Sequence, residues 1–295
     1  MEYIIENEVL KARVSAVGAE LVSLIYKDDG VEHIWQGEPE VWKYHAPILF
    51  PWCGKQVGGA FTAGGRRYEA PQHGFGRIME HRLLDMGESW LEMELCHSAE
   101  TLERWPFEFR LVSRYSLEGN RLCHSLRVEN PGSGELRFGI GYHPGFALPF
   151  DGEHSFRDYE LRFSQEESPI CLCTPRGLVT DKTCMLGKCL STVPLTEHLF
   201  DNDSFCMLGL HSKTLGLYEK GSGRAVVCEI SGFPYCLIWS APGEPRYVCI
   251  EPWHSLPSFE SDGEAWEQRS CAAVLQSGES WETCLNISFM RSQHE

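Results

Sequence analysis

The chain has 295 residues, of which 42 are Asp or Glu and 26 are Lys or Arg, so its formal net charge is −16 with histidine neutral. This balance excludes broad neutralisation of nucleic-acid phosphates, which needs clustered positive charge. Hydrophobic residues make up 42% and aromatic residues 12% of the chain, so a sizeable core can form and wholesale disorder is excluded.

The sequence gives no sign of a membrane segment or a secretory leader. No apolar run approaches the roughly 18 residues that a membrane-spanning helix needs. The N-terminus carries acidic residues where a secretory signal has lysine or arginine. We therefore expect a cytoplasmic protein without a membrane partner. The 13 cysteines are scattered, mostly in apolar surroundings and without a Cys-x-x-Cys pair, which predicts buried reduced thiols rather than disulfides.

Apolar and polar residues alternate with a period of two along the whole chain, and this pattern predicts strands with one buried face. The first two strands are expected to form an N-terminal hairpin. Two short helices are expected, over 98–105 and 263–269. In chain order, the predicted strands are 10–16, 21–26, 91–95, 107–117, 122–128, 136–142, 159–163, 205–210, 215–219, 225–231, 235–240, 246–250 and 283–289.

Many short strands without long helices between them favour antiparallel sheets packed face to face, an all-β fold. The sequence has no repeat of fixed period, no low-complexity tract and no convincing linker. The stretch 164–199 has mixed turn signals, and we interpret it as an irregular excursion rather than a domain boundary. A single domain over 1–295 is the prediction.

Two familiar motifs fail on inspection. The segment Gly139-Ile-Gly-Tyr-His-Pro-Gly145 has one residue too many in its last spacing for a dinucleotide-binding loop, and no helix pattern follows it. Glu251 and His254 have a spacing used by metal-binding helices, but Pro252 biases Glu251 away from the helical region. No cofactor and no metal site are predicted.

Three polar residues stand in aromatic or glycine-rich turns where the strand pattern breaks: His73, His143 and Glu251. The last two each precede a proline, which restricts them to extended backbone and fixes the direction of their side chains. Any one of them alone fits a hydrogen-bonded structural role better than a catalytic one. Together they offer an imidazole that titrates near neutral pH and a carboxylate, the two parts of a concerted proton transfer.

Aromatic side chains near these residues could present flat faces to the apolar side of a sugar ring. They are Trp52, Phe75 and Trp253. For each of them, packing in the core is the alternative.

Seven segments, in this order, resemble the aldose 1-epimerases (galactose mutarotases), and the closest branch is that of the LacX-type proteins. The resemblance covers nearly the whole chain and implies a β-supersandwich of the galactose mutarotase type, in agreement with the strand pattern. The segments are Ile48-Leu-Phe-Pro-Trp-Cys-Gly-Lys55, Gly65-Arg-Arg-Tyr68, His73-Gly-Phe-Gly-Arg77, Thr101-Leu-Glu-Arg-Trp-Pro-Phe107, Gly141-Tyr-His-Pro-Gly-Phe146, Leu199-Phe-Asp-Asn-Asp-Ser204 and Ile250-Glu-Pro-Trp253.

The resemblance implies roles for four residues. Glu251 matches the general base that acts on the anomeric hydroxyl, and His143 matches the general acid toward the ring oxygen. His73 matches a second histidine that supports the developing charge, and Asp203 matches an acidic residue that binds sugar hydroxyls. No cofactor is implied, because the same two groups exchange protons in both directions.

The resemblance also implies substrate contacts for Lys55, Arg77, Phe75 and Trp253. The family commonly has arginine where this chain has Lys55, and lysine lacks the planar fork that recognises paired hydroxyls. The run 254–258 lacks the glycine and aspartate frequent in this branch, which indicates a reshaped rim.

The implied function is the interconversion of α and β anomers of an aldose, with a small sugar as partner and a monomer or homodimer as the assembly. A non-catalytic or regulatory carbohydrate-binding protein with the same fold is the alternative, favoured by the departures at Lys55 and 254–258. A glycoside hydrolase could use Asp203 and Glu251 as its carboxylate pair, but the histidines would then be unexplained.

Overall fold

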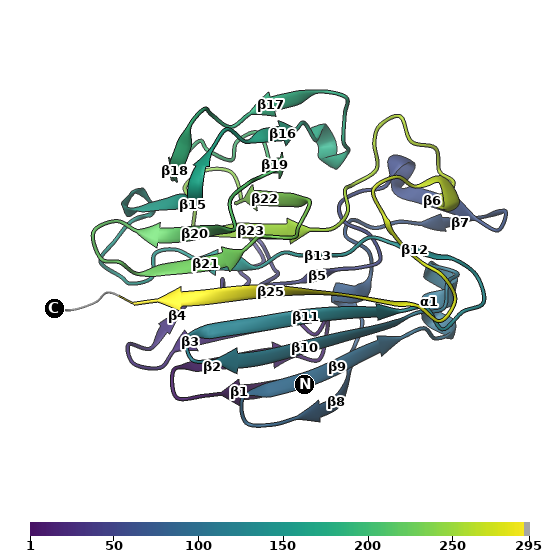
Figure 1. The fold of residues 1–295 in the computed structure, drawn as a ribbon, viewed down its shortest axis with the longest axis horizontal. Coiled ribbons are helices and arrows are strands. Elements are labelled where there is room, and N and C mark those ends of the chain that lie inside the picture. Colours follow the sequence, from purple (N-terminus) through teal and green to yellow (C-terminus); the bar gives the residue numbers. More distant parts are fainter. Residues whose placement is uncertain (292–295) are drawn as a thin grey trace.

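Two large antiparallel sheets dominate the computed structural model, which describes residues 1–291 (Figure 1). One sheet has nine strands in the order β18-β15-β20-β21-β25-β11-β10-β9-β8. The other has eight, in the order β17-β16-β19-β22-β23-β13-β5, with β14 paired to β23 beside this path. The all-β prediction is therefore confirmed.

The strands of the nine-stranded sheet are β8 (Arg82–Met86), β9 (Trp90–Cys96), β10 (Arg110–Glu118), β11 (Arg121–Glu129), β15 (Tyr159–Glu167), β18 (Leu190–Pro194), β20 (Thr214–Glu219), β21 (Ala225–Glu229) and β25 (Ser280–Met290). Those of the eight-stranded sheet are β5 (Ile48–Leu49), β13 (Gly141–Tyr142), β14 (Gly145–Ala147), β16 (Ile170–Leu172), β17 (Thr183–Met185), β19 (Phe205–Leu208), β22 (Tyr235–Trp239) and β23 (Tyr247–Trp253).

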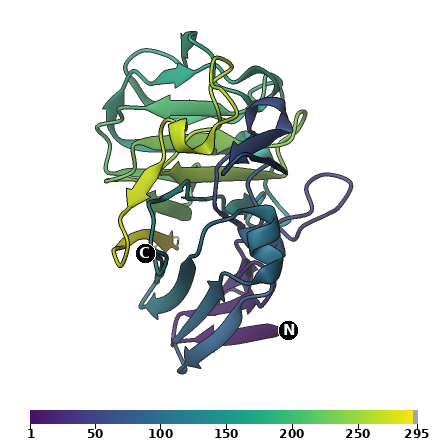
Figure 2. The same cartoon turned by 90° about the vertical axis from the view of Figure 1, so that its right-hand side faces the viewer.

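Smaller elements complete the fold. The first four strands form their own sheet, β6 pairs with β7, and β12 pairs with β24. The β6–β7 hairpin lies beside the segment that carries η5, and Thr62 and Ala265 form a bridge between them (Figure 2). The bounds are β1 (Glu2–Glu6), β2 (Leu10–Ser15), β3 (Leu21–Tyr26), β4 (Val31–Glu32), β6 (Ala60–Ala63), β7 (Arg66–Glu69), β12 (Leu136–Phe138), β24 (Ala273–Leu275), α1 (Ala99–Arg104), η1 (Val57–Gly59), η2 (Gly76–Ile78), η3 (Phe156–Asp158), η4 (Pro175–Gly177) and η5 (Trp266–Gln268).

The predicted local elements are mostly present. Strands β2 and β3 form the expected N-terminal hairpin, and α1 is the first expected helix. It begins after Ser98, whose hydroxyl accepts a hydrogen bond from the backbone N–H of Thr101 in a capping box. The second expected helix, over 263–269, is wrong, since only the three-residue 3₁₀ turn η5 forms there. No helix among the described residues is long and apolar enough to cross a membrane.

The interpretation of 164–199 as an excursion is also wrong. The end of β15 and all of β16, β17 and β18 fall within it, and they extend both large sheets. These strands are short, and β17 is exposed along its length, so they lack the alternation that marks a half-buried strand.

The cysteines depart from the prediction in two ways. The structure pairs Cys123 with Cys284 in a disulfide, between the neighbouring strands β11 and β25. Their separation of 161 residues hides this contact from the sequence. In addition, Cys96, Cys184 and Cys189 are exposed, whereas six of the other free thiols are buried as expected.

The main core lies on one face of β23, and the functional site described below lies on the other. Side chains in a strand alternate between the two faces of the sheet. Val248 and Ile250 belong to the main hydrophobic cluster, together with residues of β25 such as Ile287. Glu251 and Trp253 point to the opposite face. All seven residues of β23 are nevertheless buried, because loops cover this second face.

Candidate active site

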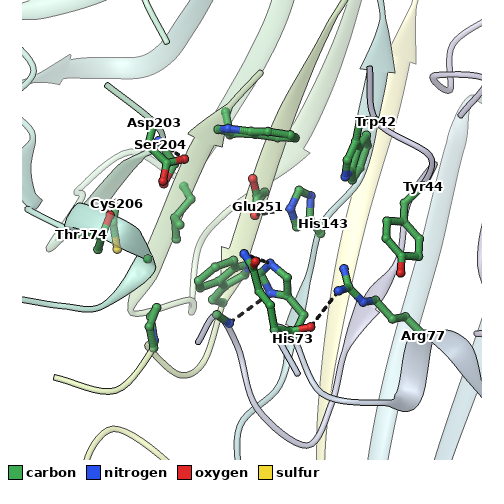
Figure 3. Close-up of a pocket in the computed structure, with 17 residues that line it drawn as sticks. Trp42, Tyr44, His73, Arg77, His143, Thr174, Asp203, Ser204, Cys206 and Glu251 are labelled. Atoms are coloured by element: carbon green, nitrogen blue, oxygen red, sulfur yellow. Dashed lines mark hydrogen bonds and ion pairs between the residues drawn. The ribbon is translucent and has the colours of Figure 1, made fainter. Parts of the chain in front are cut away.

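A cleft of about 330 Å³ opens on the face of the eight-stranded sheet that is turned away from the main core (Figure 3). Its floor is made by β23 and by the residue that follows β13. Asp203, Ser204 and Thr174 lie on one side of this floor, and Trp42 and Tyr44 lie on the other.

Glu251 and His143 meet on the floor of the cleft. Glu251 is held by the pairing of β23 with Leu237 of β22, and the backbone N–H of His143 donates to the carbonyl of Pro47. His143 Nε2 lies 3.2 Å from Glu251 Oε2, and the two side chains are 8% and 2% exposed. The two groups are therefore at proton-transfer distance and almost free of bulk water.

Burial controls the protonation of this pair. It raises the pKa of Glu251 well above its usual value, and the nearby charge of Asp203 raises that pKa further. Burial also lowers the pKa of His143, and the charge of Arg77 adds to this effect. Over a wide pH range the pair therefore holds one proton, so that one member is an acid and the other a base.

His73 presents a defined tautomer to the cleft. The backbone N–H of Gly54 donates to its Nδ1 over 3.1 Å, so the proton of the neutral ring is on Nε2. Nε2 lies 3.1 Å from the terminal amide of Gln72, whose oxygen must face the ring to accept this proton. Burial lowers the pKa of His73 well below its usual value, and the charge of His143 acts in the same direction. The ring is therefore a neutral hydrogen-bond donor.

The backbone that holds His73 is strained. His73 itself has φ +67°, a left-handed conformation that side chains other than glycine rarely adopt. Gly54 has φ +64°, and a Cβ there would lie 2.3 Å from Cγ of Pro257. Only glycine fits at this position, because the wall of the cleft closes directly over it.

Two charged side chains border the pair. Asp203 is exposed, with φ +77°, in the loop before β19, and it lines the cleft. Arg77 is half-buried, and its guanidinium lies 4.3 Å from the centre of the Tyr44 ring and donates to the carbonyl of Gln72 over 2.7 Å. Both charges are therefore available to groups of a polar ligand.

Aromatic rings fix the orientation of the imidazole. Trp42 stacks on His143 with ring centres 5.0 Å apart and an angle of 26° between the planes. Trp42 also stacks on Tyr247 and packs edge-on against Trp239. Trp253 lines the cleft, and its indole N–H donates to the carbonyl of Tyr142. These rings give the cleft apolar faces beside its polar groups.

Six of the residues singled out in the sequence line this one cleft, although they come from distant parts of the chain. Within the substituted run 254–258, Pro257 also lines it. The six are His73, Arg77, His143, Asp203, Glu251 and Trp253.

Three other residues do not line the cleft. Phe75 and Trp52 are 1% and 0% exposed and pack edge-on against each other in the main core, so the alternative of core packing applies to both. The turn at Gly74 directs Phe75 inward, where its N–H donates to the carbonyl of Phe50. Lys55 extends along the outside, and its Nζ donates to the carbonyl of Arg176. Its expected contact with sugar hydroxyls is therefore replaced by support of the turn at η4.

The sequence interpretation missed several residues of the cleft. Gln72 and Ser204 are direct neighbours of predicted residues and could have been found by adjacency. Trp42 and Tyr44 belong to an irregular loop without any pattern, and Trp239 lies within a predicted strand.

Within residues 1–291, two groups of side chains have metal-ligating atoms within 4.8 Å of one another. Asp151, His154 and Glu219 form the first, but the guanidinium of Arg224 already donates to Asp151 over 2.7 Å. The second group joins Cys249 to the pair on the cleft floor.

The chain belongs to the aldose 1-epimerase family, since the family model described as Aldose 1-epimerase matches residues 1–283. The plasmid-encoded and chromosomal LacX proteins of Lactococcus lactis subsp. lactis are 30% identical to it over 280 residues, which cover 90% of this chain and 91% of each relative.

Solved structures agree with this assignment. A galactose mutarotase related enzyme from Lactobacillus acidophilus superposes with a TM-score of 0.94 at 27% identity, over 100% of this chain and 99% of the other. A galactose mutarotase-like protein from Lactobacillus casei superposes with a TM-score of 0.88 at 28% identity, over 98% and 100% of the two chains. The expected β-supersandwich and the family resemblance are both confirmed.

Proposed function

We propose that the protein is an aldose 1-epimerase that interconverts the α and β anomers of a sugar by opening and reclosing its ring. The observation that carries this proposal is the buried contact of 3.2 Å between His143 Nε2 and Glu251 Oε2 on the floor of the cleft. Mutarotation requires a proton to leave one oxygen of the hemiacetal while another proton reaches the second oxygen.

The pair accepts one proton and supplies another, so its total number of protons does not change. Glu251 takes the proton of the C1 hydroxyl while His143 gives a proton to the ring oxygen, and the bond between C1 and that oxygen breaks. The open aldehyde rotates, and attack on its other face reverses both transfers. Burial leaves one proton on the pair and favours it on Glu251, so this proton first passes to His143 across the contact of 3.2 Å. The pair then contains the carboxylate base and the imidazolium acid that the reaction needs, and no cofactor is required.

His73 supports the charge that develops during ring opening. Its Nε2 carries the proton, because Nδ1 accepts from the Gly54 backbone. A neutral donor that is already oriented stabilises a developing negative charge without first reorganising. His73 therefore acts beside the pair as a hydrogen-bond donor to a sugar oxygen.

The lining of the cleft suits an uncharged or modified aldose. Sugar rings combine hydroxyl groups with apolar C–H faces, and binding sites for them combine polar side chains with aromatic rings. The polar side chains are Gln72, Arg77, Asp203 and Ser204, and the indole rings are those of Trp42, Trp239 and Trp253.

The non-catalytic alternative rested on the departures at Lys55 and 254–258, and the first of these no longer supports it. The departure at Lys55 falls outside the cleft, so it does not weaken sugar recognition there. Pure binding also gives no reason for a buried acid and base to lie 3.2 Å apart.

A polarimetric experiment tests the proposal. Freshly dissolved α-glucose and α-galactose relax toward the anomeric equilibrium, and we expect the purified protein to accelerate this relaxation in proportion to its concentration. The His143→Asn variant should lose roughly a hundredfold or more of the acceleration. Sugar binding detected by calorimetry without any acceleration over buffer would instead establish the non-catalytic alternative.

A further inference from the structure

A third ionisable side chain lies beside the acid-base pair and takes no part in the mechanism proposed above. Cys249 precedes Glu251 by two residues in β23, so both side chains point to the same face of the sheet. One ligating atom from each of His143, Cys249 and Glu251 lies within 4.8 Å of the other two. All three residues are more than nine-tenths buried.

The Cys249 thiol is closely packed on the side of β14. Its partner across the ladder is Gly145, where an added Cβ would lie 2.7 Å from the Trp42 ring and 3.5 Å from Cys249 Sγ. His143 reaches the group from the neighbouring strand segment, and its Nδ1 is buried without a hydrogen-bond partner. The imidazole is therefore not committed to other protein groups beyond its contact with Glu251.

The donor set is that of a soft divalent cation. Thiolate and imidazole ligands favour zinc-like ions over magnesium or calcium, which prefer oxygen. Tetrahedral zinc places its donor atoms about 3.3–3.5 Å apart, and the distance of 3.2 Å between His143 and Glu251 is close to this value. Cys249 Sγ would have to move toward the donor atoms of His143 and Glu251 by at most about 1.5 Å, which rotation of its side chain can provide.

Charge also favours a divalent cation at this position. A divalent cation bound to one thiolate, one carboxylate and one neutral imidazole gives a site of zero net charge. A buried site tolerates such a neutral assembly far better than two uncompensated anions.

We propose that His143, Cys249 and Glu251 form an inhibitory site for zinc-class divalent cations, with the fourth coordination position facing the cleft. This proposal rests on the proposed epimerase function, because the bound ion takes up the lone pairs that the acid and the base need. Sugar and metal then compete for the same two side chains. Metal-saturated protein should therefore lose at least about a hundredfold of its epimerase rate.

Cobalt(II) provides a probe that does not depend on activity. We expect metal-free protein, kept reduced with a phosphine, to develop the near-ultraviolet absorption of a thiolate bound to Co²⁺, and added Zn²⁺ to abolish it. Cys249→Ser should remove this absorption and raise the Zn²⁺ concentration that halves the epimerase rate by roughly 100-fold. The ratio of rates with and without Zn²⁺, measured for each variant, corrects for any change in basal activity.

Cys206 supplies the matched control, since its thiol lines the same cleft but is not one of the three ligands. Cys206→Ser should keep both the absorption and the zinc sensitivity. If Cys249→Ser fails to fold, Glu251→Gln must weaken Co²⁺ binding instead.

The outcomes separate the two proposals. An absorption that persists in Cys249→Ser, or that disappears in Cys206→Ser, overturns the metal site and leaves the epimerase function standing. A Cys249-dependent absorption in a protein without epimerase activity confirms metal binding, overturns inhibition as its role and refutes the proposed function.

Discussion

Replacing Glu251 by glutamine tests the acid-base pair most directly. The substitution keeps the size of the side chain and removes its ability to exchange a proton. Because burial favours the protonated carboxyl, a neutral amide fits the same surroundings, and we expect the fold to persist. General acid-base catalysis contributes about 10²–10⁴-fold, so the loss should correspond to about 2.7–5.5 kcal/mol of transition-state free energy.

The pair should also behave as one unit. If His143 and Glu251 exchange a single proton over 3.2 Å, removing either member disables the other. The double variant Glu251→Gln with His143→Asn should then be no more than about tenfold slower than either single variant, as found when residues act together. Independent action would instead multiply the two losses.

Nuclear magnetic resonance exchange between the α and β anomers of glucose, at fixed pH, measures these rates. Glu219→Gln is the control, since Glu219 is likewise a buried carboxyl, 1% exposed against 2% for Glu251, but lies outside the cleft. Thermal unfolding confirms that each variant is folded. A Glu251→Gln rate above one tenth of the wild-type rate, or losses that multiply in the double variant, would refute the assignment of the pair.

Two further predictions follow from the surroundings of the pair. The negative charge of Asp203 raises the pKa of Glu251, so the Asp203→Asn variant should lower that pKa. The alkaline limb of the kcat/KM profile should then move to lower pH. An unchanged limb would contradict the electrostatic coupling between Asp203 and Glu251. Gly54→Ala should lower the free energy of unfolding, measured with urea, by about 2–5 kcal/mol. The loss is expected because alanine is strained in the left-handed backbone conformation and its Cβ would overlap Pro257. A loss below about 1 kcal/mol would show that the loop around Gly54 rearranges to accept the methyl group. The kcat of this variant then reports whether His73 has kept its position.

The sequence was sufficient to predict the class of fold, because a strand with one buried face imposes a period of two on its own residues. The nine residues of β10 show this alternation, and their prediction was nearly correct. Strands without a buried face, such as β17, carry no such pattern and were missed. The pairing of Cys123 with Cys284 depends on which strands become neighbours, and local periodicity contains no information about that.

The site was predictable to the extent that its residues break local rules. The prolines after His143 and Glu251 marked residues with fixed side-chain directions, and both lie on the floor of the cleft. The direction of Phe75 depended on a turn that packs against Phe50, and only the tertiary structure shows that it points inward. Trp42 belongs to a loop without periodicity, and its stacking on His143 and Tyr247 is visible only in the tertiary structure.

Strand β23 carries core residues and site residues in alternation, and this arrangement limits how the protein can diversify. A substitution at Val248 or Ile250 would tilt the backbone that also bears Glu251. Changes in core packing on one face of the strand therefore alter the position of the catalytic side chain on the other face. The loop that bears Asp203 is under no such restriction. If the proposed function holds, new sugar preferences can arise by remodelling this loop, while the strand keeps the proton chemistry unchanged through successive substrates.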